Sequence, residues 1–355
     1  MKVTFPAWHF IAPLLLALTI QSCQKSDSAI QNNPPGNDTT KHDPQQKPWT
    51  AMAAVPSVGR QQAASFVIGQ KFYVGLGSGF KDNNQQDLSD IYVFDLQTGG
   101  WSQKGDFPGG PREFAQGFSI NGKGYIALGQ SITCMPGCEG LNCCKAKLHN
   151  DIWEYNEATD QWTMVATIPD IDTNNVLVAK SFVIGSKAYI HCAGKFWEFD
   201  PSGYSITPKA DCPGALVFTS SFAVNGKGYI GTGENGGSTL LKSVYEYDPA
   251  NDHWTKKSDF AGPARRFATG FAVGGKGYIG CGELMTPLNA NDFKWIDVND
   301  VWEYSPDSDT WKQVANYPGA SSLYKVAGVI GQKAIIGTGR TYEGPIFFLN
   351  EFWIY

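Results

Sequence analysis

Three arginines stand at equivalent places in an internal repeat of this 355-residue chain. Each lies six residues before a residue that opens a copy of the repeat: Arg60 before Phe66, Arg112 before Phe118 and Arg265 before Phe271. A guanidinium group presents several donors in one plane, which suits a carboxylate or sugar hydroxyls. The three arginines are therefore candidate ligand-binding residues. A structural alternative stays open, in which each arginine bonds backbone carbonyls between neighbouring repeats.

Further polar and aromatic residues fall in the segments that connect the copies of the repeat. The candidate ligand-binding residues in these segments are Arg340, Glu234, Glu283 and Trp295, with Arg266, Glu113 and Glu343 nearby. Trp295 and the other loop aromatics could stack on sugar rings, or they could only pack the loops down; these aromatics are Phe80, Phe293, Tyr342 and Phe347.

Four of the eight cysteines lie in one insertion: Cys134, Cys138, Cys143 and Cys144. In an exported protein this grouping predicts two disulfides that close a long loop. A zinc site with His149 as a further ligand is the alternative. Cys192 and Cys212 form a second candidate disulfide. We expect no cofactor.

The first 22 residues have the features of a signal peptide. Lys2 precedes an apolar run from Ile11 to Ile20 that is too short to span a bilayer. A small residue before Cys23 resembles a bacterial lipobox, so we expect Cys23 to be acylated, with an ordinary signal peptide as the alternative. Gln24, where an aspartate would signal inner-membrane retention, favours an outer-membrane lipoprotein that faces the periplasm or the cell surface. Residues 23–48 are polar and predict a disordered tether.

A repeated β-hairpin organises residues 49–355. Residues 271–282 read as apolar residues, a two-glycine turn and more apolar residues, with close copies at 222–231 and 118–126. Looser copies begin at Phe66, Phe182 and Gly328. A strand of alternating aromatics and then a strand that opens with Trp follow most copies. A unit that recurs every ~40–50 residues predicts a propeller or a solenoid.

The repeated motif resembles the Kelch repeat. The matching features are paired glycines after the second strand, as at Gly280 and Gly282, and the Asn-Asp-x-Trp-Glu-Tyr runs at 150–155 and 299–304. The resemblance covers residues 49–355 and implies an all-β fold, a six-bladed β-propeller with four strands in each blade. Three strands close the chain and residues 49–53 provide a fourth. We therefore expect an N-terminal outer strand to complete the last blade and close the ring.

The strand directions place short and long loops on opposite faces of this propeller. Hairpin turns such as Asn225-Gly226 are short. The opposite face, which we call the long-loop face, carries Ser78–Ser89, Gln130–Asn150, Glu283–Asn299 and Arg340–Leu349. Loops longer than a connection requires usually carry function, so we expect irregular binding loops here. Three aspartates that open third strands should bond neighbouring backbone: Asp90, Asp151 and Asp300.

Composition and histidine placement limit the possible functions. A net charge of −5 argues against a nucleic-acid surface. Kelch propellers include galactose oxidase, but only His149 and His191 are placed where they could join a copper site, and they match no motif of that site. No specific catalytic set is recognised, so we expect a binding module more than an enzyme.

The main prediction is a monomeric, membrane-anchored propeller that binds a protein partner or a glycan through the long-loop face. The alternative is an enzyme that acts on a sugar at the same face. It would be an isomerase similar to the sialic-acid mutarotases, with Arg265 and Glu283 or Glu234 near the channel, or a protein similar to galactose oxidase without its copper site.

Overall fold

The computed structural model describes residues 49–81, 84–134, 144–171, 178–192, 194–214, 216–236, 239–289, 292–341 and 347–355. The expected signal peptide, the acylation at Cys23 and the tether to residue 48 lie outside these ranges and stay predictions. The described residues form strands and loops without a helix, so they include no helix that could cross a membrane. The unit discussed below falls within residues 45–132 and 146–355.

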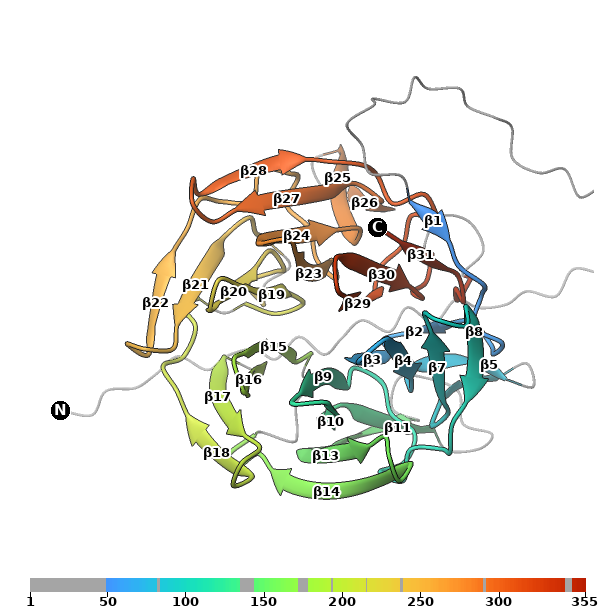
Figure 1. The fold of residues 1–355 in the computed structure, drawn as a ribbon. Coiled ribbons are helices and arrows are strands. Elements are labelled where there is room, and N and C mark those ends of the chain that lie inside the picture. The colour runs from blue at the N-terminus through green and yellow to red at the C-terminus, as the bar shows by residue number, and fades with distance from the viewer. Residues whose placement is uncertain are drawn as a thin grey trace, which may run out of the picture. The chain divides into compact units, whose positions relative to one another are not determined.

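In the described part of the chain, six four-stranded antiparallel sheets, the blades, surround one centre (Figure 1). The first three blades are β3 (Ala64–Ile68), β4 (Lys71–Gly75), β7 (Ile91–Asp95) and β8 (Gly100–Gln103); β9 (Gln116–Ile120), β10 (Lys123–Ala127), β13 (Asp151–Asn156) and β14 (Gln161–Thr167); and β15 (Lys180–Ile184), β16 (Lys187–Cys192), β17 (Lys195–Asp200) and β18 (Ser205–Pro208). The other three are β19 (Ser220–Val224), β20 (Lys227–Gly231), β21 (Val244–Asp248) and β22 (His253–Lys256); β23 (Thr269–Val273), β24 (Lys276–Gly280), β27 (Val301–Ser305) and β28 (Thr310–Gln313); and β29 (Val326–Ile330), β30 (Lys333–Gly337), β31 (Phe352–Ile354) and β1 (Thr50–Ala51). This confirms the all-β propeller.

The two ends of the described chain meet in the last blade. β1 pairs antiparallel with β31, with Thr50 opposite Ile354 and Ala51 opposite Trp353. The N-terminal strand therefore supplies the outer strand of a blade whose other strands come from the C-terminus, as the sequence predicts. Pairing of this kind also covers a strand edge that would otherwise be open to aggregation.

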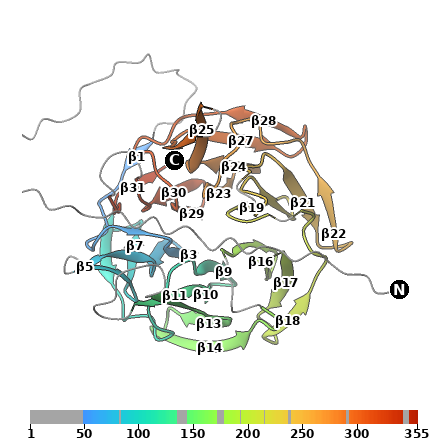
Figure 2. The same cartoon turned by 180° about the vertical axis from the view of Figure 1, so that it is seen from behind.

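The inner strands β3, β9, β15, β19, β23 and β29 each contact the next, and β29 contacts β3. In the view from behind, β3, β9, β19, β23 and β29 lie nearest the centre of the ring (Figure 2). Hydroxyl groups reinforce these contacts. Ser65 donates to the carbonyl of Ala327 at 3.2 Å, and Thr269 donates to that of Lys325 at 2.7 Å. Both bonds link an inner strand to a neighbouring blade.

The long loops are more regular than expected. They contain β2 (Arg60–Gln61) with β5 (Ser78–Lys81) and β6 (Asn84–Asp87), the pair β11 (Gln130–Cys134) and β12 (Cys144–Leu148), and the pair β25 (Glu283–Asn289) and β26 (Asp292–Asp297). Hairpin pairing satisfies the backbone groups that an irregular loop would leave to solvent. On the opposite face, Asn225 and Gly226 have φ values of 52° and 74°, which suit a tight two-residue turn.

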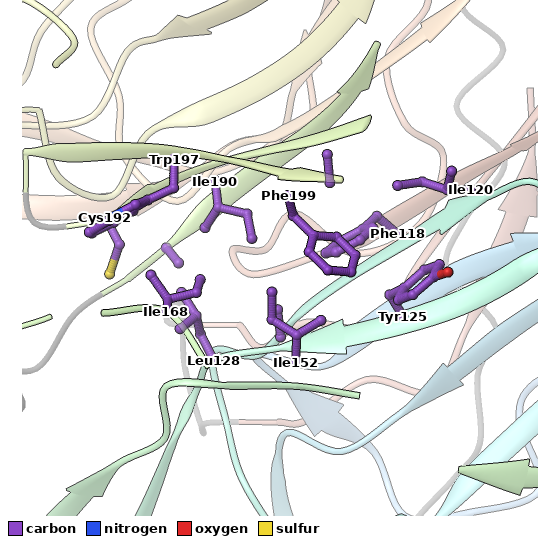
Figure 3. Close-up of a cluster of buried hydrophobic side chains, with 13 residues drawn as sticks. Phe118, Ile120, Tyr125, Leu128, Ile152, Ile168, Ile190, Cys192, Trp197 and Phe199 are labelled. Carbon is purple, nitrogen blue, oxygen red and sulfur yellow. The ribbon is translucent and has the colours of Figure 1, made fainter. Parts of the chain in front are cut away.

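Aromatic rings fill the interfaces between blades. Phe199 of β17 packs edge-on against Tyr125 of β10, with ring centroids 5.5 Å apart, in a cluster between the second and third blades (Figure 3). Phe222 of β19 stacks on Tyr229 of its own blade, with the centroids 4.9 Å apart. The Phe222 ring also meets Gly277 of the next blade. A Cβ atom at Gly277 would lie 2.1 Å from this ring.

The same contact recurs around the ring, with one reversal. A Cβ at Gly124 would lie 2.2 Å from the Phe66 ring, and one at Gly228 would lie 2.0 Å from that of Phe182. Where the sixth blade meets the first, the sizes are exchanged. Gly328 stands at the phenylalanine position of β29, and Phe72 of β4 occupies the glycine position, with a Cβ at Gly328 2.6 Å from its ring.

We expect Gly277→Ala to lower the free energy of unfolding by ~1–3 kcal/mol, because the added methyl group overpacks the Phe222 ring. Urea unfolding followed by tryptophan fluorescence measures the change. Gly105→Ala, at a position with open space, is the control. Phe222→Leu in the Gly277→Ala background should recover part of the loss. An equal effect of the two glycine substitutions would contradict the packing argument.

Candidate functional site

The three repeat-equivalent arginines are buried and occupied. The side chains of Arg60, Arg112 and Arg265 are fully inaccessible to solvent. Arg265 donates to both carboxylate oxygens of Asp300 at 2.6 and 2.7 Å and to the carbonyl of Cys281 at 3.1 Å. It fastens the loop that enters the fifth blade to that blade's second and third strands.

The other two arginines make equivalent contacts. Arg60 bonds Asp90 at 2.8 and 2.9 Å and the carbonyl of Leu76 at 3.1 Å. Arg112 bonds Asp151 and the carbonyls of Leu128 and Gly109. These arginines therefore have a structural role, and they bond backbone carbonyls as the alternative to ligand binding expected. Their bonds join parts of one blade and not neighbouring blades. The expectation that the aspartates bond mainly backbone is corrected, since each accepts from a guanidinium group.

Buried ion pairs set the ionisation of two of the aspartates, Asp300 and Asp151. Burial raises the pKa of Asp300, but the hydrogen bonds and charge of Arg265 outweigh burial and hold the pKa below its usual range. Asp151 follows the same pattern with Arg112. Each of these two ion pairs stabilises the fold fully at a pH above the ordinary carboxyl pKa. This stabilisation is lost as the pH falls through the lowered pKa of the folded state.

Arg266, the residue after Arg265, lies at the centre of a cluster of side chains on the long-loop face. Its Nε donates to Glu283 at 2.8 Å and its Nη1 donates to Glu234 at 3.0 Å. Its guanidinium carbon lies 3.8 Å from the centre of the Trp295 ring. We call Arg266, Glu234, Glu283 and Trp295 the arginine cluster. The structure thus brings together three of the predicted site residues around one that the sequence placed only nearby.

The sequence contains a signal for Arg266 that its repeat position obscures. Neighbouring residues of an extended segment point to opposite sides. Since Arg265 points into the blade, the residue after it must face outward. Arg266 forms a bridge with Glu283, the residue at the start of the β25–β26 hairpin. Burial raises the pKa of Glu283, and the charge and hydrogen bond of Arg266 oppose that rise.

Glu113 is the most perturbed carboxyl group of this face. Its side chain is only 4% exposed and accepts a hydrogen bond from Gln130 Nε2 at 2.8 Å. Burial raises the pKa of Glu113 to about 7, and the Gln130 bond opposes the rise. The positive charge of Arg340 lowers the pKa of both Glu113 and Glu283, so Arg340 lies within electrostatic range of both. The Arg340 guanidinium also lies 5.6 Å from the ring centre of Tyr324.

A small cavity of about 50 Å³ opens at the central channel between the starts of the inner strands. Phe218 and Phe267 line it, and both rings contact the Arg266 guanidinium, at 5.9 and 4.8 Å. A larger cavity of about 300 Å³ lies along β8, between Lys71 and Lys104. It contains none of the predicted site residues, so we place the candidate site at the channel.

The predicted cysteine chemistry receives no support. Cys192 and Cys212 are buried free thiols, so the disulfide predicted between them is not formed. The side chains of the four-cysteine insertion, Cys134, Cys138, Cys143 and Cys144, lie outside the described residues, and their pairing stays a prediction. His149 contacts Ser131 Oγ at 3.0 Å, and the described part of the chain gathers no group of three metal-binding side chains.

We expect Arg265→Leu to lower the free energy of unfolding at pH 7 by ~3–5 kcal/mol, because the Asp300 carboxylate stays buried without its partner. Urea unfolding at pH 7 and pH 4 tests this. Protonation of Asp300 should make the loss smaller at pH 4. The double variant Arg265→Leu/Asp300→Leu should recover stability at pH 7. An equal loss in the single and the double variant would contradict the pairing.

Glu113 makes a separate contribution to the pH dependence of stability. Its pKa is about 7 in the folded chain against an ordinary value of 4.5, so the folded state retains a proton that the unfolded chain releases. Stability from this group therefore falls as the pH rises from 4.5 through 7. We expect Glu113→Gln to be more stable than the wild type at pH 8, by up to about 3 kcal/mol, and to match it near pH 4.5. A difference that is the same at both pH values, measured by urea unfolding, would contradict this assignment.

Comparisons with known proteins find sequence similarity to a protein named as an epimerase and to one named as a Kelch-like protein. It is 23% identical over 279 residues to N-acetylneuraminate epimerase of Pasteurella multocida, which covers 77% of this chain and 64% of that protein. It is 24% identical over 269 residues to Kelch-like protein 25 of Xenopus tropicalis, covering 73% of this chain and 41% of that protein. The match thus spans less than two thirds of the length of either relative. No protein-family model matches the chain.

The comparison of structures agrees with the strand arrangement. The solved structure of YjhT superposes with a TM-score of 0.67 and 17% sequence identity, over 84% of this chain and 95% of that chain. At this identity the likeness shows the fold alone. Together with the six four-stranded sheets of the described residues and the repeated hairpins, it shows that this chain folds as a β-propeller.

Proposed function

We propose that the long-loop face binds an acidic sugar such as N-acetylneuraminate and interconverts two of its stereoisomers. The observation that carries the proposal is the buried Glu113 carboxyl, with a pKa of about 7, within electrostatic range of Arg340. The similarity to a protein named N-acetylneuraminate epimerase supports the choice of substrate class. This is the alternative that the sequence left open, with different residues in the main roles.

The simplest reaction that fits these groups is the exchange of the two anomers of the sugar. One group takes the proton of the anomeric hydroxyl while a proton is given to the ring oxygen, the ring opens, and closure on the other face reverses both transfers. A carboxyl group with a pKa near the working pH can perform both transfers. Glu113 has that property, and Glu283, whose pKa burial also raises, is a second candidate.

The arginines would provide the attraction for the acidic substrate. Arg266 already contacts two carboxylates, Glu234 and Glu283. Arg340 is partly exposed, and its positive charge lowers the pKa of both Glu113 and Glu283, which belongs to the arginine cluster. We therefore propose Arg340 as the residue that attracts the carboxylate of the sugar. Trp295 presents a ring beside Arg266 that could pack on the apolar side of the sugar.

Exchange spectroscopy by NMR tests the activity directly on the equilibrium mixture of N-acetylneuraminate anomers. We expect the protein to increase the anomer exchange rate at pH 7 and Glu113→Gln to reduce this increase by ~100-fold or more, since it removes the titrating group. Asp307→Asn, on an exposed turn of the opposite face, should leave the rate unchanged. Undiminished exchange in Glu113→Gln would reject the role of Glu113, and no increase with the wild type would reject the activity.

A second candidate function is a binding module without catalysis. Large apolar side chains stand exposed on the long loops: Phe80 at 48%, Leu288 at 60%, Phe293 at 50% and Phe347 at 59%. Exposed aromatic residues of this kind favour a protein or glycan partner at the same face. Binding of the sugar without faster exchange in the NMR experiment would favour this second function.

A further inference from the structure

The cavity at the central channel has lining residues from every blade. Each blade places the residue two positions before its inner strand at the channel mouth: Gln62, Phe114, Val178, Phe218, Phe267 and Tyr324. Four of these are aromatic. Their rings contact one another in the order Phe114, Tyr324, Phe267 and Phe218, with centroids 5.7, 4.4 and 4.4 Å apart. These four rings form an apolar part of the cavity wall, beside polar side chains such as Gln62 and Gln116.

The backbone holds this aromatic wall in place. Phe114, Phe218, Phe267 and Tyr324 all have φ between 56° and 62°, a conformation that costs an L-residue energy. Backbone bonds between blades hold them there. Phe267 donates its N–H to the carbonyl of Phe218 at 3.0 Å, and Phe114 donates to that of Gln62 at 3.0 Å. Groups inside the cavity consequently face aromatic rings whose positions are fixed by the backbone.

One charged side chain in this cavity has no counterion among the residues that the structure describes. Lys180 begins β15, lines the cavity and is partly buried, and none of the described residues forms a hydrogen bond or an ion pair with it. The second lysine of the cavity, Lys325, is engaged. Its ammonium group bonds the carbonyl of Thr338 at 3.2 Å and lies 4.1 Å from the ring centre of Tyr317 and 3.8 Å from the Glu351 carboxylate.

The other ionisable groups around Lys180 do not neutralise it. His191 is its cross-strand partner on β16, and burial lowers the pKa of this histidine to about 4, so the ring is uncharged at neutral pH. Burial raises the pKa of Tyr324, which keeps its hydroxyl neutral, and Lys325 carries the same sign of charge as Lys180. Burial lowers the pKa of Lys180 to about 8, as expected for an ammonium group without a counterion.

A second unpaired polar atom belongs to Gln62, which also lines the cavity. The side-chain oxygen of Gln62 is buried and has no hydrogen-bond partner among the described residues. An unpaired cation and an unpaired acceptor, on two side chains that line one cavity, are complementary to a carboxylate and a hydroxyl group. A 2-hydroxy acid carries these two groups on adjacent carbons.

We propose that Lys180 and Gln62 form a binding subsite in the central channel for a 2-hydroxy carboxylate, with Lys180 bound to the carboxylate and Gln62 to the hydroxyl. The cavity of about 50 Å³ compares with the ~10–15 Å³ that one water requires, so it suits a two- or three-carbon acid. It also suits the carboxylate end of a larger acid that enters from the long-loop face. The anomeric carbon of an acidic sugar carries the same two groups, and this second source of the ligand rests on the proposed function.

Calorimetry with glycolate, the smallest 2-hydroxy acid, tests the subsite independently of any reaction. We expect saturable binding at pH 7 that weakens about tenfold or more in Lys180→Gln. This variant keeps the fold, because Gln116 occupies the equivalent position at the start of β9. Lys195→Gln removes an exposed lysine of the same blade and should bind glycolate as the wild type does.

The pH dependence of glycolate affinity provides a second measurement. With the pKa of Lys180 at about 8, the binding-competent ammonium form is scarce at pH 9, so glycolate should bind ~10-fold more weakly there than at pH 7. Lys180→Gln should show no such dependence. The subsite is rejected if the wild type does not bind glycolate, if Lys180→Gln binds it equally, or if affinity is constant between pH 7 and pH 9.

N-acetylneuraminate and its methyl ester separate the two sources of the ligand. The sugar-acid source is supported if the wild type binds the free acid but not the ester, and if Lys180→Gln loses this binding. Glycolate binding without any N-acetylneuraminate binding leaves the small-acid subsite in place and removes the proposed substrate. N-acetylneuraminate exchange that is unchanged in Lys180→Gln, with no glycolate binding, overturns the subsite and leaves the proposed function intact.

Discussion

In this propeller, an aromatic side chain of one blade packs against a very small residue of the next blade, and the closed ring of blades depends on this contact. Phe66, Phe182 and Phe222 each cover a glycine of the following blade so closely that a methyl group could not be inserted. Buried alanines, Ala188 and Ala334, stand at the same repeat position in two other blades. In the repeated Gly-Lys-Gly-Tyr motif, the second glycine is thus required by the aromatic ring of a neighbouring blade. The first glycine, before the lysine, is required by the turn.

The adjacent arginines Arg265 and Arg266 show how the propeller separates support from chemistry. Arg265 points into the blade and locks the entering loop through Asp300, while Arg266 faces the channel mouth between two glutamates. Equivalent scaffold arginines recur as Arg60 and Arg112, but Arg266 has Gln61 and Glu113 at its repeat positions. The residues held constant between the blades therefore build the ring, and the position just after them supplies the different groups of the mouth.

The sequence predicts the repeated parts well, because each copy reports on the others. The hairpins, the four-stranded blades and the pairing of β1 with β31 follow from motifs that recur or that complete one another. The mouth could not be predicted as well, because its properties come from single positions on different blades. The pKa of Glu113 depends on burial and on Gln130 and Arg340, from distant parts of the chain. Lys180 has a Gln, a Ser and a Thr at equivalent positions, so the repeat gives no indication of its role.

The exchanged sizes of Gly328 and Phe72, where the last blade meets the first, have an evolutionary consequence. The interior interfaces each pair a ring with a glycine or an alanine of the following blade. Duplication or loss of a whole interior blade would leave each ring facing one of these small residues. The first and last blades are instead a matched couple, since either one beside an interior blade would face two rings or leave a void. Changes of blade number in this lineage would accordingly be tolerated inside the ring and selected against at its junction.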